Sequence, residues 1–275
     1  MKTLLIGNGN VITRNPDHPF IVGGCVAVEG RQIKEVGQSG ALREKYAGAE
    51  WVDAHGGVIM PGLINAHNHI YSAMARGLSI KGHSPANFMD ILDGMWWRID
   101  RLLTTEQVRY SALVTYIDCI KNGVTTVFDH HASYGAITGS LFTIADAAKE
   151  LGVRTCLCYE VSDRDGEEKM KAAVQENEEF IRSAQKDGGH MQKGMMGLHA
   201  SFTLSDKTLE YCAEHKPDYA GYHIHVAEGL DDVEDSLQKY GKRVVARLRD
   251  KGILGEKTIA AHCIHIDEGE MEMLK

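Results

Sequence analysis

The chain has 275 residues, and its 43% hydrophobic and 25% charged residues are the composition of an ordinary globular protein. The net charge of -8 provides no basic surface for nucleic acid or anionic lipid, so we expect a small-molecule substrate and neither kind of partner. The N-terminal apolar run ends at Gly7, too early for a signal peptide or a membrane span, so we expect a cytoplasmic location.

Short strands joined by tight turns are expected in residues 1–57. The expected strands are Leu4–Ile6, Val11–Thr13, Cys25–Val28 and Ile33–Val36. Asn8-Gly9 and Glu29-Gly30 predict hairpin turns between them. The sequence therefore predicts a small N-terminal β sandwich, which needs partner strands from elsewhere because a unit of this size is marginally stable.

Residues 58–275 alternate apolar strands with amphipathic helices. The expected strands are Val58–Ala66, Val124–Asp129, Val153–Tyr159, Met195–His199, Tyr219–His225 and Thr258–His262. The expected helices are Glu106–Lys121, Ile137–Leu151, Glu167–Ala184 and Asp232–Asp250.

This alternation predicts an α/β protein with a parallel sheet, either open and doubly wound or closed into a barrel. Histidines recur where the strands end, which favours the barrel, since a (β/α)8 barrel collects its site at those ends. Only six strands are counted, so we expect a (β/α)8 TIM-type barrel that is truncated after strand six.

The cysteines and histidines show whether a thiolate or an imidazole metal site is expected. Six cysteines are scattered without a C-x-x-C pair, which disfavours both a disulfide framework and a thiolate zinc site. The 14 histidines include close pairs, namely His67 and His69, His130 and His131, His223 and His225, and His262 and His265. Histidines scattered over a surface would not cluster in this way, so the pattern indicates a metal bound by imidazoles.

The strongest motif is PGLINAHNH, residues 61–69. His67 and His69 are two residues apart at a strand end, so both imidazoles point to the same side and can reach one ion. A chance H-x-H near a loop is the alternative for this pair alone.

The second motif is HIHVAE, residues 223–228. Alternation puts His223 and His225 on the same side of the strand and does not choose between them as a metal ligand. Proximity to the strand end and to Glu228 favours His225. Glu228 could carry a proton over the same ion, or it could be a solvated loop carboxylate.

The third motif is AAHC, residues 260–263, in which His262 closes an apolar strand. Alone, His262 would more often be a hydrogen-bonded strand-end residue than a catalyst. Three such motifs on successive strands of one barrel are hard to reach by chance, so together they favour a metal enzyme.

These motifs and the β-rich preface resemble the amidohydrolase superfamily, in the branch of mononuclear-metal aminohydrolases that includes guanine, cytosine and S-adenosylhomocysteine deaminases and chlorohydrolases. Within that branch, DHHAS at residues 129–133, Trp96-Trp97-Arg98 and GYHIHVAE look closest to the aminohydrolases called SsnA.

The resemblance implies a zinc or iron(II) ion held by His67, His69 and His225. It implies Glu228 as the proton shuttle and His262 as the group that positions or polarises the attacked atom. The family's fourth protein ligand is an aspartate at the end of strand eight, which no residue of this chain matches. We therefore expect it beyond Lys275.

One ion is expected, because binuclear relatives use a lysine or glutamate on strand four, whereas this strand ends in His199 and Lys193 precedes it. His199 is expected to face the substrate, or else to cap a loop. Trp97, with Trp96, could form an aromatic wall for a planar ring, or either could be core. His131 is a further candidate for substrate binding.

The sequence therefore predicts a metal-dependent aminohydrolase that deaminates a purine- or pyrimidine-like ring with a metal-activated water. An amidase, cyclic-amide hydrolase or chlorohydrolase on the same scaffold, and a catalytically silent assembly relative, remain open alternatives. A homodimer is also left open.

Overall fold

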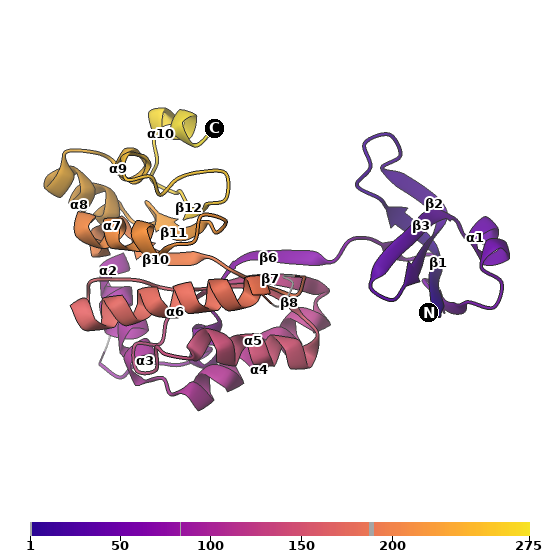
Figure 1. Ribbon diagram of the computed structural model, residues 1–275, viewed down its shortest axis with the longest axis horizontal. Helices are drawn as coiled ribbons and strands as arrows, with labels where there is room; N and C mark the ends of the chain where they lie inside the picture. Colours follow the sequence, from indigo (N-terminus) through magenta and orange to yellow (C-terminus); the bar gives the residue numbers. More distant parts are fainter. Residues whose placement is uncertain (1, 83, 187–189) are drawn as a thin grey trace. The chain divides into compact units, whose positions relative to one another are not determined.

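The computed structural model describes residues 2–82, 84–186 and 190–275, and the chain divides into two compact units, Met1–Gly62 and Leu63–Lys275 (Figure 1). Among these described residues no helix is both long and apolar enough to cross a membrane.

The first unit is a five-stranded sheet with the order β3-β2-β1-β4 and with β5 paired to β1. Its strands are β1 (Thr3–Ile12), β2 (Phe20–Glu29), β3 (Gln32–Gln38), β4 (Glu50–Asp53) and β5 (Val58–Ile59). Strands β1, β2 and β3 are antiparallel, whereas β4 and β5 run parallel to β1. Helix α1 (Ser39–Lys45) adds the buried Leu42 to a small core with Leu5, Cys25 and Ala27.

One of the two predicted turns is wrong. Asn8-Gly9 makes no hairpin, because β1 continues through it with Asn8 at a φ of 56° and a register shift against β2 between Ile6 and Gly9. The dipeptide forms a bulge inside the strand, because left-handed backbone occurs in β-bulges as well as in hairpin turns. The turn at Glu29-Gly30 is confirmed, since β2 and β3 pair antiparallel directly across it.

The predicted strand Val58–Ala66 is interrupted. Pro61 lies between β5 and β6 (Leu63–Asn68), and a proline cannot donate the hydrogen bond that would continue a strand ladder. Because β5 pairs with β1, residues up to Gly62 belong to the first unit, whereas the sequence placed the boundary after residue 57.

The second unit contains parallel strands in chain order. They are β6, β7 (Val124–His131), β8 (Arg154–Tyr159), β9 (Gln192–Gly194), β10 (Met196–Ala200), β11 (Tyr222–Val226) and β12 (Ile259–His262). The strands form the sheets β6-β7-β8-β9 and β10-β11-β12, and a parallel bridge between Val161 and Leu198 links them. Parallel strands in this order, separated by helices, are consistent with part of a (β/α) barrel.

Thirteen helical segments lie within the described residues of the whole chain, α1 included. In the second unit they are η1 (Ile70–Ala75), α2 (Phe88–Ile91), η2 (Leu92–Trp96), α3 (Trp97–Leu102), α4 (Thr105–Lys121), α5 (Ser140–Leu151), α6 (Glu167–Lys186), η3 (Ser201–Thr203), α7 (Asp206–His215), α8 (Leu230–Tyr240), α9 (Val244–Asp250) and α10 (Glu268–Leu274). The single helix predicted over Asp232–Asp250 is wrong, because Gly241 ends α8 in the left-handed region at a φ of 64° before α9 begins.

Strands β10 and β11 lie in the centre of the second unit, where every residue of both is buried. Their approach to β8 requires Gly197, because a Cβ there would lie 2.3 Å from the carbonyl oxygen of Tyr159. The histidines on these strands, His199, His223 and His225, are therefore held in a low-dielectric interior.

Candidate metal centre and active site

The paired histidines of separate strands meet in one cluster. The ring centroid of His67, on β6, lies 4.8 Å from that of His69, 5.1 Å from that of His225 and 5.0 Å from those of His223 and His262. Parallel strands place their carboxyl ends together, which is why motifs far apart in sequence converge here.

His67, His69 and His225 bring one ring nitrogen each within 4.8 Å of one another. The structure thus places together the three residues that the sequence predicted as ligands. Three imidazoles are a donor set that zinc accepts, and their role as ligands stays a prediction.

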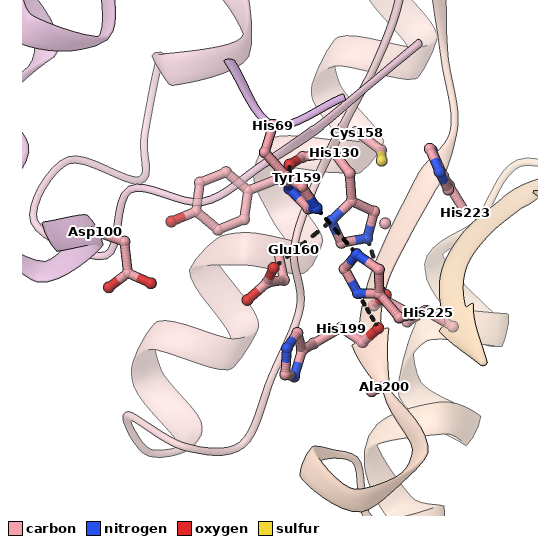
Figure 2. Close-up of polar contacts among 12 residues, drawn as sticks. His69, Asp100, His130, Cys158, Tyr159, Glu160, His199, Ala200, His223 and His225 are labelled. Carbon is pink, nitrogen blue, oxygen red and sulfur yellow. Dashed lines mark hydrogen bonds and ion pairs between the residues drawn. The ribbon is translucent and has the colours of Figure 1, made fainter. Parts of the chain in front are cut away.

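Hydrogen bonds to the backbone fix the tautomers of two of these rings. Nδ1 of His69 donates to the carbonyl oxygen of His130, and Nδ1 of His225 donates to that of His199, both at 2.8 Å (Figure 2). Their Nε2 atoms consequently carry lone pairs, yet lie only 3.2 Å apart. Two facing lone pairs repel each other, so this geometry fits a shared cation. Donation of the second ring nitrogen to a carbonyl is also the usual support of a metal-bound histidine.

The third ring, His67, has its Nδ1 2.8 Å from Nε2 of His223. Its Nε2 is buried and finds no hydrogen-bond partner in the described parts of the chain. With Nδ1 donating to His223, the lone pair on Nε2 is available to an ion. The sequence did not choose between the two histidines of β11 as a metal ligand. The structure distinguishes them, because Nε2 of His223 contacts His67 whereas Nε2 of His225 faces His69.

All three rings are neutral at pH 7. Burial lowers the pKa of His67 to about 3 and that of His69 to about 4, and it lowers the pKa of His225 well below its usual value. Metal binding requires neutral imidazole, so no proton has to be displaced near neutral pH.

Glu228 and His262 lie beside the cluster. Nε2 of His262 is 3.4 Å from Oε2 of Glu228, and both side chains are partly buried. Burial, followed by the charges of Asp232 and Glu160, raises the pKa of Glu228 to about 7. A carboxyl with that pKa can both accept and return a proton at neutral pH.

The backbone is strained where these two residues leave their strands. Ala227 and His262 have φ values of 46° and 72°, in the left-handed region that non-glycine residues rarely occupy. Asp232, 2% exposed, accepts a 2.9 Å hydrogen bond from the amide of Ala227 and a 3.0 Å bond from that of Phe202, which fixes the turn before Glu228. Such outliers persist only where surrounding contacts impose them, often at functional sites.

These groups line a cavity of about 190 Å³. Its wall consists of His67, His69, Tyr71, Ser72, Phe88, Leu92, Trp96, Trp97, Glu160, His199, His225, Glu228 and His262. Two of the predicted substrate residues therefore reach the cavity, with the rings of Trp97 and His199 6.1 Å apart.

The third predicted substrate residue, His131, does not line this cavity. Its side chain is fully buried, and its Nε2 lies 2.9 Å from the hydroxyl of Ser133. The adjacent His130 points to the opposite face of β7, where its ring centroid lies 4.4 Å from that of His225.

Sequence reasoning missed Glu160, directly after β8. Figure 2 shows its carboxylate directed toward His130, at 3.6 Å from Nδ1, and Arg164 lies 3.7 Å away. Burial opposes ionisation of Glu160, but His199, His130 and Arg164 outweigh it and lower the pKa, so the carboxylate is charged at neutral pH. No motif marked this residue, because a lone Glu after a strand carries no spacing signal.

Residues 58–275 match the amidohydrolase family, and the chain belongs to it. The 5'-deoxyadenosine deaminase of Methanosarcina barkeri is 30% identical over 275 residues, which cover 100% of this chain and 60% of that enzyme. The chain thus spans 60% of the length of this relative.

Two solved structures show the same fold. The triazine hydrolase of Arthobacter aurescens has a TM-score of 0.86 and 22% identity, covering 100% of this chain and 63% of that protein. An adenosine deaminase of Xanthomonas campestris with bound zinc has a TM-score of 0.80 and 22% identity, covering 98% of this chain and 60% of that protein.

Proposed function

We propose that the protein is a metal-dependent aminohydrolase that removes an amino group from a nitrogen heterocycle by hydrolysis. The observation that carries the proposal is the convergence of one ring nitrogen each from His67, His69 and His225 at the cavity that Glu228 also lines. The similarity to a 5'-deoxyadenosine deaminase and to a zinc-containing adenosine deaminase supports this chemistry. The proposed architecture is a (β/α)8 TIM-type barrel with an N-terminal β sandwich.

His67, His69 and His225 would hold one ion, zinc or iron(II). When bound, such an ion makes hydroxide available by lowering the pKa of water to about 7. Glu228 takes the proton of the attacking water and returns it to a ring nitrogen or to the leaving amine. A carboxyl with a pKa of about 7 suits both transfers.

His262 is proposed to position the attacked group, since its Nε2 lies 3.4 Å from Glu228 and it lines the same cavity. Trp97 and His199 bind the substrate from the cavity wall. A planar ring can lie against the indole, and the neighbouring imidazole can hydrogen-bond to its edge.

The test is ammonia release from a panel of purine nucleosides, purines, pyrimidines and aminotriazines by the zinc-loaded protein. For Glu228→Gln we expect zinc retention with turnover reduced about a hundredfold or more, because the proton carrier is removed and the ion's ligands are kept. Glu234→Gln, an exposed site on α8, is the matched control. Near-normal turnover by Glu228→Gln would remove this residue from the mechanism, and no ammonia from any ring would refute the proposed function.

A further inference from the structure

The Glu160 carboxylate is a buried anion that faces the cavity without a hydrogen bond. It is 3% exposed, lines the cavity, and accepts no hydrogen bond from residues 2–82, 84–186 or 190–275. Its ion-pair partners, His130 at 3.6 Å and Arg164 at 3.7 Å, lie beyond hydrogen-bond distance, and one carboxylate oxygen lies within 4.8 Å of a ring nitrogen of His225. A buried carboxylate without such a partner is costly, so a donor from a bound molecule is expected to supply it.

Neither neighbour donates a hydrogen bond to Glu160. Nε2 of His130 donates to the carbonyl oxygen of Leu198 at 3.0 Å, and its Nδ1, 3.6 Å from Glu160, makes no hydrogen bond within the described residues. Both terminal nitrogens of Arg164 bond to Asp100, and Nη1 also pairs with Asp165 at 3.3 Å. The terminal nitrogens of this guanidinium are therefore bonded to other carboxylates, whereas its Nε finds no hydrogen-bond partner within the described residues.

His199 adds a second acceptor to the same cavity. The hydroxyl of Thr203 donates to the carbonyl oxygen of Ala200 at 3.1 Å, so it accepts from Nδ1 of His199 at 2.7 Å. Nε2 of His199 is consequently a lone pair. The wall that includes Trp97 thus presents hydrogen-bond acceptors beside an aromatic face.

We propose that Glu160 determines specificity by accepting hydrogen bonds from an amidine-type edge of a planar substrate, meaning a ring N–H beside an amino group, or an amidinium. This inference names the substrate class of the proposed aminohydrolase and rests on that function. A ring edge whose ring nitrogen beside the amino group is unprotonated, as N1 of adenine is, places a lone pair against the carboxylate and is disfavoured.

The test uses two probes of nearly equal shape on the zinc-loaded full chain. Benzamidine is a planar amidinium with N–H donors on both nitrogens, whereas benzamide replaces one nitrogen by an acceptor oxygen and is neutral. Calorimetric titration should show benzamidine binding about ten- to a hundredfold more tightly than benzamide, the range expected for charge-assisted hydrogen bonds. In Glu160→Gln this preference should vanish while zinc content and benzamide affinity stay unchanged.

Glu168→Gln, an exposed carboxylate on α6, is the matched control and should keep the preference. Unchanged benzamide binding by Glu160→Gln shows that its cavity is folded, and Glu160→Asp, which retains the charge, should keep part of the preference. The inference is overturned if the wild type does not prefer benzamidine, or if Glu160→Gln retains the preference. It is also overturned if Glu160→Gln loses zinc, because Glu160 would then balance the charge of the ion.

The proposed function and this inference fail separately. Absence of ammonia release from every ring, together with a benzamidine preference that depends on Glu160, would refute deamination and leave the recognition of donor edges standing. Ammonia release without that preference would refute the inference alone.

Discussion

Replacing His223 by alanine tests whether this buried ring supports the metal centre through His67. His223 is 1% exposed, and its Nε2 lies 2.8 Å from Nδ1 of His67. Alanine would leave the Nδ1 proton of His67 buried without an acceptor and the ring free to rotate. Loss of such a supporting contact lowers metal affinity about ten- to a hundredfold, or about 1.4 to 2.7 kcal/mol.

The assay is competition for zinc between the protein and a chromophoric chelator, followed at equilibrium. His223→Gln should recover much of the affinity, because its side-chain oxygen can accept the same proton. His18→Ala, which removes an exposed histidine from the first unit, should leave the affinity unchanged. Wild-type affinity in His223→Ala would refute the supporting role, as would equal losses in the alanine and glutamine variants.

Three further predictions concern stability in urea. Arg247, 2% exposed, donates to four acceptor atoms within residues 201–206. Arg247→Met should therefore lower the free energy of unfolding by about 2 to 4 kcal/mol, and a smaller loss would show that these bonds contribute little. Gly197→Ala should cost about 1 to 3 kcal/mol, because its Cβ would meet the Tyr159 carbonyl, and wild-type stability would contradict the close approach. Burial raises the pKa of Asp129 from 3.8 to about 8, so the free energy of unfolding should fall by about 1.4 kcal/mol per pH unit between these values. Asp129→Asn should remove that slope, and an unchanged slope would contradict the raised pKa.

The sign of the Asp129 effect follows from its raised pKa in the folded state. Asp129 binds its proton more tightly in the folded chain than in the unfolded one. Its contribution to the free energy of unfolding is therefore complete below pH 3.8 and disappears as the pH rises through about 8.

The histidine cluster was predictable because each member closes an apolar strand, and parallel strands end at one edge. His67, His69 and His225 meet for that reason. The tautomers could not be predicted, since they depend on carbonyl oxygens of neighbouring strands, such as that of His199 for His225. Sequence spacing fixes which face a side chain occupies and does not show what it meets there.

The residues that sequence reasoning missed act through contacts made only in the folded chain. Asp232 reads as an ordinary acidic residue in the first turn of a helix, yet it holds the backbone before Glu228. Glu160 is unmarked in sequence and becomes unusual only when the surrounding elements bury it. The break at Gly241 was missed because the apolar spacing of α8 and α9 runs across it.

The most direct test of the metal centre is the zinc stoichiometry of the purified protein after equilibrium dialysis, compared with His67→Ala, His69→Ala and His225→Ala. We expect one zinc per wild-type chain and a large loss in each variant, with the far-ultraviolet circular dichroism unchanged. Full zinc occupancy in any of the three variants, or a wild-type chain that binds none, would contradict the shared site.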